Sequence, residues 1–168
     1  MKLSVIIISF QSDHLLKKIL INFPKKYQVI IVENSMLTST KKLKKKFKNI
    51  NILNPNQNLG YSKAFNLALK KCKNNFVLTV TPDVLINKDL IIKLEKFIDK
   101  FKNFTLLAPE YKNQKIYKNY IPLDRTKLNK NIIKGFKIEK VREIDWCFCI
   151  LNKKKLPNLK ILDENFFM

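Results

Sequence analysis

Apolar runs alternate along the chain with stretches of helical periodicity, a pattern typical of an α/β protein. Four short runs indicate strands buried on both faces, at residues 3–9, 27–32, 50–53 and 76–80. After each run, apolar residues recur at helical spacing, over residues 13–22, 38–48, 60–73 and 90–101. Four successive strand and helix units predict a mainly parallel sheet flanked by helices, in a single domain. Ser12 is expected to cap the first helix.

The pattern becomes weaker after residue 108, where the chain is rich in Tyr, Asn and Lys. Residues 104–108 form a fifth apolar run, and residues 144–151 predict one more strand. Cys147 and Cys149 would lie on the same face of that strand. Packing is therefore the expected role of both side chains, and neither is assigned any chemistry.

Composition removes several classes of chemistry. The two glycines, Gly60 and Gly135, are too far apart for a dinucleotide fingerprint or a Gly-rich phosphate loop. His14, the single histidine, falls at the start of a predicted helix, so a histidine metal site or a Ser-His-Asp relay has little support. Three cysteines without a CxxC pair indicate neither a disulfide framework nor a zinc site. Any diphosphate would be bridged by a metal ion, or the protein has no catalytic role.

The net charge of +21 suggests an anionic partner, but the type of base argues against nucleic acid. All but two of the 34 basic residues are lysines, and the lysines are scattered over nearly every segment. Proteins that read phosphates or bases rely on the bidentate fork of arginine. We interpret the charge as a solvated surface with a weak attraction to anionic membranes. The predicted localisation is the cytoplasm, with the inner face of the membrane as an open alternative.

Polar residues gather where the predicted parallel strands end, at Ser9, Glu33, Asn58 and Asp83. Ligands of open α/β sheets bind beyond these carboxyl ends. Glu33 can accept from the imide N–H of a pyrimidine, and Asn58 can bond ribose or phosphate. Asp83 offers a hard oxygen ligand for Mg²⁺ or Mn²⁺ bridging a diphosphate. The alternative is that Asn58 and Asp83 are turn and capping residues. Each of them, considered alone, more often has that role.

Six short motifs occur in a fixed order along the chain: SVIIISF (4–10), IIVENS (30–35), NPNQNLGYSKAFN (54–66), VTPDV (80–84), EIDW (143–146) and LDENFFM (162–168). Their order and spacing resemble those of the family 2 glycosyltransferases, which have the GT-A fold, and especially of the rhamnosyltransferase-like branch. The third motif is the most specific. The corresponding family elements are VVDNAS for the second, NPDT for the fourth, VDW for the fifth and FDE-x-FFM for the sixth.

The resemblance implies a hexosyltransferase of cell-envelope polysaccharide synthesis. It would move a sugar such as rhamnose from a UDP- or dTDP-sugar to a cell-surface glycan or lipid-linked acceptor, by inverting displacement. It assigns residues 1–108 to nucleotide-sugar binding and 109–168 to an incomplete acceptor part. The implied donor site comprises Ser9, Phe10, Glu33, Asn58, Lys63 and Asp83, with the metal on Asp83, and the acceptor side comprises Asp145 and Trp146.

The chain departs from the family in three places. Cys147-Phe148-Cys149 stands where the family has a Gly-Ala pair, and Asp83 is a single carboxylate, so metal binding should depend on nucleotide. The family's base lies in an ED pair after FFM, so it would fall beyond Met168 and the catalytic residue is unassigned. Asp163 and Glu164 are expected to be structural turn residues. We therefore interpret the chain as a C-terminally truncated transferase.

Two other functions remain open. One is a noncatalytic, degenerate or truncated nucleotide-sugar-binding domain, which the missing base favours. The other, less favoured, is a lysine-rich RNA-binding module in which bases stack on tyrosines, namely Tyr61, Tyr111, Tyr117 and Tyr120.

Overall fold

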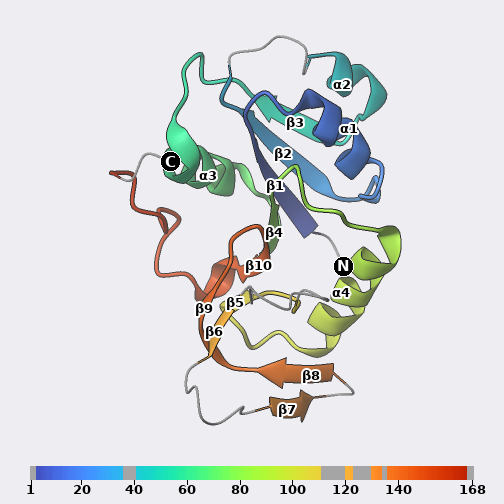
Figure 1. Ribbon diagram of the computed structural model, residues 1–168, viewed down its shortest axis with the longest axis vertical. Helices are drawn as coiled ribbons and strands as arrows, with labels where there is room; N and C mark the ends of the chain where they lie inside the picture. Colours follow the sequence, from blue (N-terminus) through green and yellow to red (C-terminus); the bar gives the residue numbers. More distant parts are fainter. Residues whose placement is uncertain (1–2, 36–40, 111–119, 123–129, 134–135, 166–168) are drawn as a thin grey trace.

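A six-stranded sheet forms the centre of the computed structural model, which describes residues 3–35, 41–110, 120–122, 130–133 and 136–165 (Figure 1). Its strand order is β3-β2-β1-β4-β10-β5. The parallel strands are β1 (Leu3–Ser9), β2 (Gln28–Glu33), β3 (Ile50–Leu53) and β4 (Phe76–Val80). An antiparallel strand, β10 (Phe148–Asn152), lies between β4 and the short β5 (Leu106–Leu107). The predicted mainly parallel α/β sheet is confirmed.

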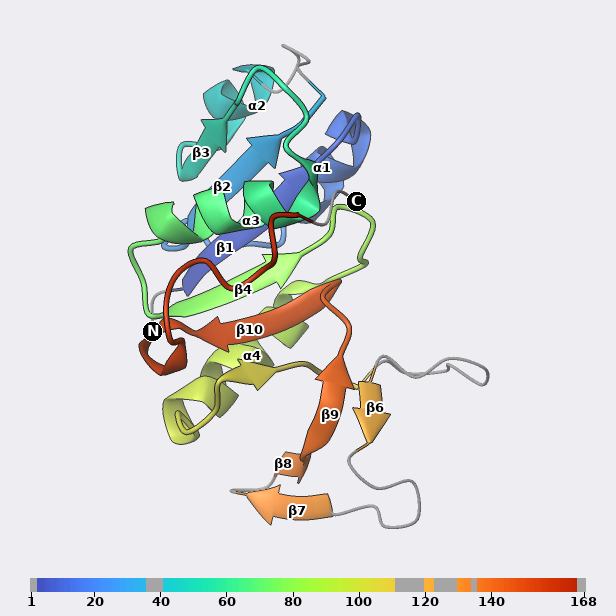
Figure 2. The same ribbon diagram turned by 90° about the vertical axis from the view of Figure 1, so that its left-hand side faces the viewer.

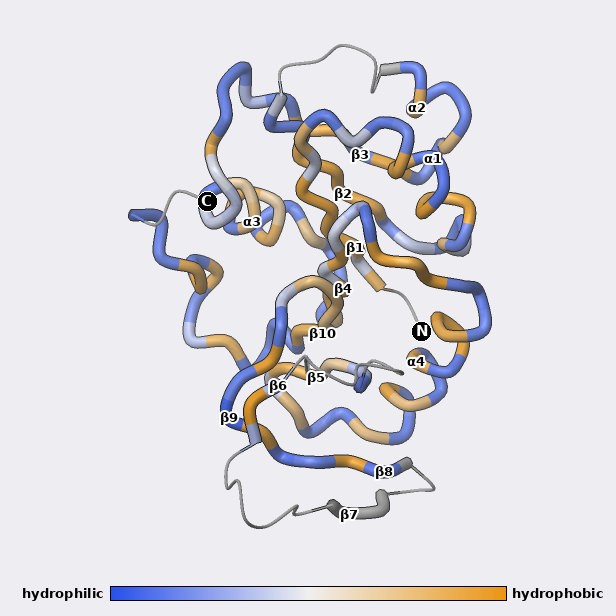
Figure 3. The backbone as a smooth tube through the Cα atoms, in the orientation of Figure 1, coloured by the Kyte–Doolittle hydropathy of each residue, from blue (hydrophilic) through white to orange (hydrophobic). Residues whose placement is uncertain are grey.

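Helices cover both faces of this sheet (Figure 2). The helices α1 (Asp13–Leu20), α2 (Lys41–Lys46) and α4 (Lys88–Lys100) pack on one face, and α3 (Gly60–Lys71) packs on the other. Alternate residues of β1 serve the two layers, since Val5 and Ile7 face one and Ile6 faces the other. Apolar residues accordingly follow the central strands, whereas polar ones occupy the outer surface (Figure 3).

Smaller strands extend the molecule beyond the main sheet. An antiparallel pair is formed by β6 (Tyr120–Pro122) and β9 (Val141–Ile144), and another by β7 (Lys130–Ile133) and β8 (Phe136–Glu139). In the part of the chain that the structure describes, none of the helices has the length and apolar character needed to cross a membrane.

The strand predicted at residues 144–151 is wrong, because the structure divides this run between two sheets. Residues up to Ile144 belong to β9, and β10 begins at Phe148. Between them the carboxylate of Asp145 accepts a hydrogen bond from the backbone N–H of Cys147, at 3.2 Å, and closes a turn. Cys147 therefore lies in this turn and does not share a strand face with Cys149, which is fully buried in β10.

The start of α1 also differs from the prediction. Ser12 occupies the capping position, but its hydroxyl donates to the carbonyl of Phe10, at 2.8 Å, and makes no capping bond. The first turn is closed instead by the carbonyl of Ser12, which accepts from the N–H groups of Leu15 and Leu16. His14 is exposed on this helix, as expected.

Candidate functional site

The carboxyl ends of β1 and β2 are joined through buried side chains. Ser9 and Glu33 are register partners in the parallel pair, and both are fully buried. The Ser9 hydroxyl donates to Oε2 of Glu33 at 2.8 Å. The other carboxylate oxygen accepts from the backbone N–H of Ser35, at 3.0 Å, and from the Ser35 hydroxyl. A buried carboxylate needs such donors, so Glu33 fixes the chain as it leaves both strands.

The next residue, Asn34, connects this strand end to the start of α3. Its side-chain amide donates to the carbonyl of Gly60 at 3.2 Å, and its side-chain oxygen accepts from the N–H of Leu59 at 3.5 Å. Asn58 accepts from the N–H of Gly60 at 2.9 Å, so it closes a turn directly before α3, whose N-cap residue is Leu59. Gly60 has a φ of 69°, which disfavours any side chain at this position.

A cavity of about 330 Å³ opens at this edge of the sheet. Its walls are Ile8, Ser9, Phe10, Asn34, Asn58 and Tyr61. The ring of Phe10 is 52% exposed, which leaves a free apolar surface at the rim. Three of the residues predicted for the donor site, Ser9, Phe10 and Asn58, thus line one cavity, and Glu33 lies behind Ser9.

A second rim is formed where β4 ends and β10 begins. The N–H of Thr81 donates to the carbonyl of Cys147 at 3.0 Å, which ties the loop after β4 to the turn before β10. Asp83 is exposed in that loop. Burial, a hydrogen bond with Asp145 and the charges of Asp145 and Asp83 raise the pKa of the Cys147 thiol to about 11. Two carboxylates therefore act on this thiol, which is neutral near pH 7.

This second rim carries two carboxylates. Within the described residues, no group of three or more His, Cys, Asp or Glu side chains is placed to hold a metal ion. Asp83 and Asp145 both lie close enough to Cys147 for their charges to act on its thiol, and their hard oxygen atoms are of the type that Mg²⁺ and Mn²⁺ prefer. The residues present fit a divalent ion if a bound phosphate completes its ligands. Lys63 is exposed on the first turn of α3.

Aromatic side chains connect the two rims. Tyr61 stacks on Phe65 with ring centroids 6.2 Å apart, and its hydroxyl lies 3.3 Å from that of Thr79 in β4. Burial raises the pKa of Tyr61 to about 12. Trp146 contacts the same Phe65 edge-on, at 5.3 Å.

These contacts bear on the RNA alternative. Tyr61 is engaged through both its ring and its hydroxyl, so it is not free to stack on a base. Tyr120 lies in β6, away from this cavity, and Tyr111 and Tyr117 lie outside the described residues.

Sequence reasoning did not assign Asn34, Tyr61 or Thr79 to the donor site. Asn34 and Tyr61 stood within the second and third motifs, next to assigned residues, and that adjacency was the available signal. Their roles depend on contacts with Gly60 and Thr79, on other elements.

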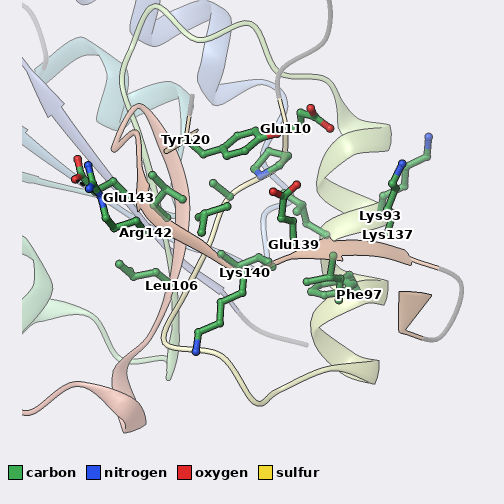
Figure 4. A pocket seen from close by; sticks show the side chains of 17 residues that line it. Lys93, Phe97, Leu106, Glu110, Tyr120, Lys137, Glu139, Lys140, Arg142 and Glu143 are labelled. Carbon is green, nitrogen blue, oxygen red and sulfur yellow. Dashed lines mark hydrogen bonds and ion pairs between the residues drawn. The ribbon is translucent and has the colours of Figure 1, made fainter. Parts of the chain in front are cut away.

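A larger cavity, of about 570 Å³, lies elsewhere, between α4, β5 and the strands β8 and β9 (Figure 4). Leu94, Phe97 and Ile138 contribute apolar walls, and charged residues such as Lys93, Lys137 and Glu139 surround them. None of the residues predicted for the donor site lines this cavity. Chemistry at the strand ends, and not cavity size, identifies the candidate site.

A mainly parallel sheet between helical layers, with its polar cluster at the carboxyl edge, defines a GT-A type of α/β domain. The family model Glycosyl transferase family 2 matches residues 4–159. The chain belongs to this family.

Known relatives agree with this assignment. The poly(ribitol-phosphate) beta-N-acetylglucosaminyltransferase TarS of Staphylococcus aureus is 30% identical over 118 residues, which are 64% of this chain and 20% of TarS. The chain thus spans about one fifth of the length of this curated relative. A crystal structure of S. aureus TarS matches 59% of this chain and 32% of that chain, with 30% identity and a TM-score of 0.53.

A second solved structure matches more of the chain at lower identity. The mannosyltransferase PcManGT from Pyrobaculum calidifontis, in complex with GDP-Man and Mn²⁺, covers 90% of this chain and 44% of its own, at a TM-score of 0.64. Because the identity is 13%, this likeness shows the fold alone.

Proposed function

We propose that the chain forms the nucleotide-sugar-binding part of an inverting glycosyltransferase that uses a UDP- or dTDP-sugar. The observation that carries this proposal is the pre-formed cluster of Ser9, Glu33, Asn34 and Asn58 around a cavity at the carboxyl edge of the sheet. Family membership supplies the reaction class. This cavity would hold a nucleoside, although the chain has no Gly-rich loop.

Each wall of the cavity has a task in this proposal. The exposed side chain of Phe10 supports the base, and Ser9 lines the wall beside it. Glu33, fully buried behind Ser9, holds this wall in place through the Ser9 hydroxyl. The oxygen of Asn58 accepts from the N–H of Gly60, so its amide N–H groups would serve the ribose or a phosphate. Lys63, exposed on the first turn of the same helix, supplies positive charge for the diphosphate.

Asp83 would hold Mg²⁺ or Mn²⁺ together with the donor diphosphate. A divalent ion held there would supply positive charge next to the leaving nucleotide. Asp145 and Trp146, on the turn before β10, would face the acceptor. The complex of PcManGT with GDP-Man and Mn²⁺ supports metal use in a domain of this fold.

The name of one relative supports a proposal for the acceptor and the sugar. TarS is named for transfer of N-acetylglucosamine to poly(ribitol phosphate), which supports a cell-surface polymer as acceptor and adds this sugar to rhamnose as a candidate. Residues 109–168 would contribute the acceptor part. We place the reaction at the cytoplasmic side of the membrane, where the abundant lysines give weak peripheral attraction to anionic lipid.

A second candidate function, binding without turnover, has its own supporting observation. Asp163 accepts from the N–H of Asn165 at 3.0 Å, as a turn residue does. Glu164 bonds Asn66 at 3.1 Å and Lys160 at 3.2 Å. Both carboxylates thus have structural partners, which favours neither as the base.

Calorimetric titration with UDP and dTDP tests the proposal, with and without Mn²⁺. We expect one nucleotide to bind the unmodified chain with Mn²⁺, and its affinity to fall about tenfold or more without the metal or in Asp83→Ala. Asp99→Ala, which removes an exposed carboxylate from α4, is the matched control and should bind like the unmodified chain.

Each contrary result has a distinct meaning. If neither nucleotide binds the unmodified chain, the proposed function is wrong. Binding of RNA that falls steeply with salt, but ignores nucleotide and Mn²⁺, would support the RNA alternative instead.

A further inference from the structure

The C-terminal segment runs back along α3 after β10. A 3-10 helix (Lys153–Lys155) is anchored at the far end of α3, where Lys153 donates to the carbonyls of Asn75 and Cys72, at 2.8 and 2.6 Å. Residues 156–165, named here the terminal strap, then turn toward the start of α3 (Figure 2). Apolar strap residues pack on the same cluster as α3, namely Leu156, Leu159, Ile161 and Leu162.

One buried side chain, Asn66 in α3, holds the middle of the strap. Its amide donates to the carbonyl of Leu162 at 2.8 Å and to the Glu164 carboxylate at 3.1 Å. Its oxygen accepts from the N–H groups of Ile161 and Leu162, both at 3.2 Å. Asn66 is 1% exposed, so both of its donors and both of its acceptor sites are used, all on the strap.

Asparagine is a poor residue for a helix interior, so its presence at position 66 points to its contacts with the strap. An aliphatic side chain would fill the space but leave the strap N–H groups without their partner. Glu164 adds an ionic component, since its hydrogen bond with Asn66 and then its contact with Lys160 lower the pKa of its exposed carboxyl. The contacts form a small network that recognises one segment of this chain.

The same helix carries walls of the candidate site. Its first residue, Gly60, is bonded by Asn34 and Asn58. Tyr61 lines the cavity, and Phe65, directly before Asn66, contacts Trp146. Asn66 thus lies on the same helix as these walls, less than about two turns from Gly60 and Tyr61.

We propose that Asn66 is a positioning residue that locks the terminal strap to α3 and couples its order to occupancy of the nucleotide cavity. The identity of the ligand rests on the function proposed above, whereas the lock itself rests on the four hydrogen bonds alone. Asn66 acts through the strap and touches no reacting group.

Hydrogen exchange at the amides of Ile161 and Leu162 tests the lock in the whole chain without nucleotide. Asn66→Asp keeps both acceptor sites but loses the donors and faces the Glu164 carboxylate. Near pH 7 we expect exchange to be about tenfold faster or more. Adding Glu164→Gln to Asn66→Asp supplies a donor to the new carboxylate, so protection should recover in part. Glu164→Gln alone, at the exposed end of the network, should have a smaller effect.

Asn152→Asp is the matched control. Asn152 is also buried and bonds backbone groups of Lys102 and Lys154, at 3.0 and 3.2 Å, but it lies outside the strap. Its replacement should leave strap exchange within about twofold of the unmodified chain. Exchange in β1 and β2 reports whether each variant folds.

Repeating the measurement with UDP, dTDP and Mn²⁺ tests the coupling. The bound nucleotide should slow strap exchange about threefold or more in the unmodified chain, and this response should disappear in Asn66→Asp. Equal strap protection in Asn66→Asp and the unmodified chain overturns the lock. Nucleotide binding that leaves strap exchange unchanged overturns the coupling. If no nucleotide binds, the proposed function and the coupling both fail, and exchange without nucleotide still decides the lock.

Discussion

The two rims of the candidate site are built in opposite ways. At the rim formed by β1 and β2, Glu33 is fully buried and bonded to Ser9 and Ser35. At the rim formed by β4 and β10, Asp83 is exposed and Asp145 closes a turn. Both rims carry carboxylates, but one uses its carboxylate to hold the protein together and the other presents charge to solvent.

This difference separates recognition from charge neutralisation. The first rim needs no ligand to keep its shape, because its polar atoms already have partners. In the function proposed above, its cavity would therefore select a nucleoside by shape. The second rim keeps carboxylate charge available for a cation, which the diphosphate would bring with it.

Removing the two carboxylates should affect stability very differently. Glu33→Ala leaves the buried donors of Ser9 and Ser35 without an acceptor, so the free energy of unfolding should fall by about 3 kcal/mol. Asp83→Ala should change it by less than about 0.5 kcal/mol, because the side chain is exposed. Urea denaturation measures both, and similar losses would contradict the contrast drawn between the rims.

A backbone change at the first rim should have the next largest effect. Gly60→Ala adds a side chain at a φ of 69°, next to the bonds of Asn34 and Asn58. We expect a loss of about 1 to 2 kcal/mol in the free energy of unfolding. Asn56→Gly, at a φ of 59° in the preceding loop, is the control and should cost less than about 0.5 kcal/mol. Urea denaturation measures both variants, and equal midpoints for Gly60→Ala and Asn56→Gly would contradict this prediction.

Thiol reactivity probes the charge at the second rim. With its pKa raised to about 11, Cys147 should react slowly with iodoacetamide near pH 8, and the rate should rise about tenfold per pH unit below that pKa. Asp145→Asn removes a negative charge, so the pKa should fall and the rate near pH 8 should rise. Asp83→Asn should act in the same direction but less. Mass spectrometry identifies the modified cysteine, and a rate that Asp145→Asn leaves unchanged would count against this arrangement.

Loss of the aromatic contact between the rims should have the smallest effect. Trp146→Leu removes the edge-on contact with Phe65 and should lower the free energy of unfolding by about 1 kcal/mol or less. Nucleotide affinity should stay within about twofold, since Trp146 does not line the cavity. Calorimetry measures the affinity, and a large loss would place Trp146 on the donor side.

The sequence predicted the sheet because its strands are short apolar runs. The runs at residues 3–9, 50–53 and 76–80 have the same bounds in the structure, since these mostly apolar segments form the buried strands of the sheet. The strand predicted at residues 144–151 was wrong because that prediction also relied on an apolar run alone. The apolar run continues through a turn that the Asp145 side chain closes, and hydropathy does not register such a turn.

The candidate site was predictable where its residues end a strand. Ser9 and Glu33 follow directly from the rule that parallel strands meet at their carboxyl ends. Asn66 could not be found this way. It lies inside an amphipathic helix, and its partners are more than 90 residues away in the sequence.

The place of β10 in the sheet has a consequence for folding. The strand β5 follows α4 directly, yet it pairs with β10, whose first residue comes some forty positions later. The outer edge of β4 also pairs with β10. A nascent chain that has reached residue 108 therefore presents an unpaired apolar edge at Phe76–Val80, open to pairing with another molecule. Because β10 joins the sheet late, we expect this domain to fold slowly through contacts that are distant in the sequence. Fragments that lack β10 should aggregate.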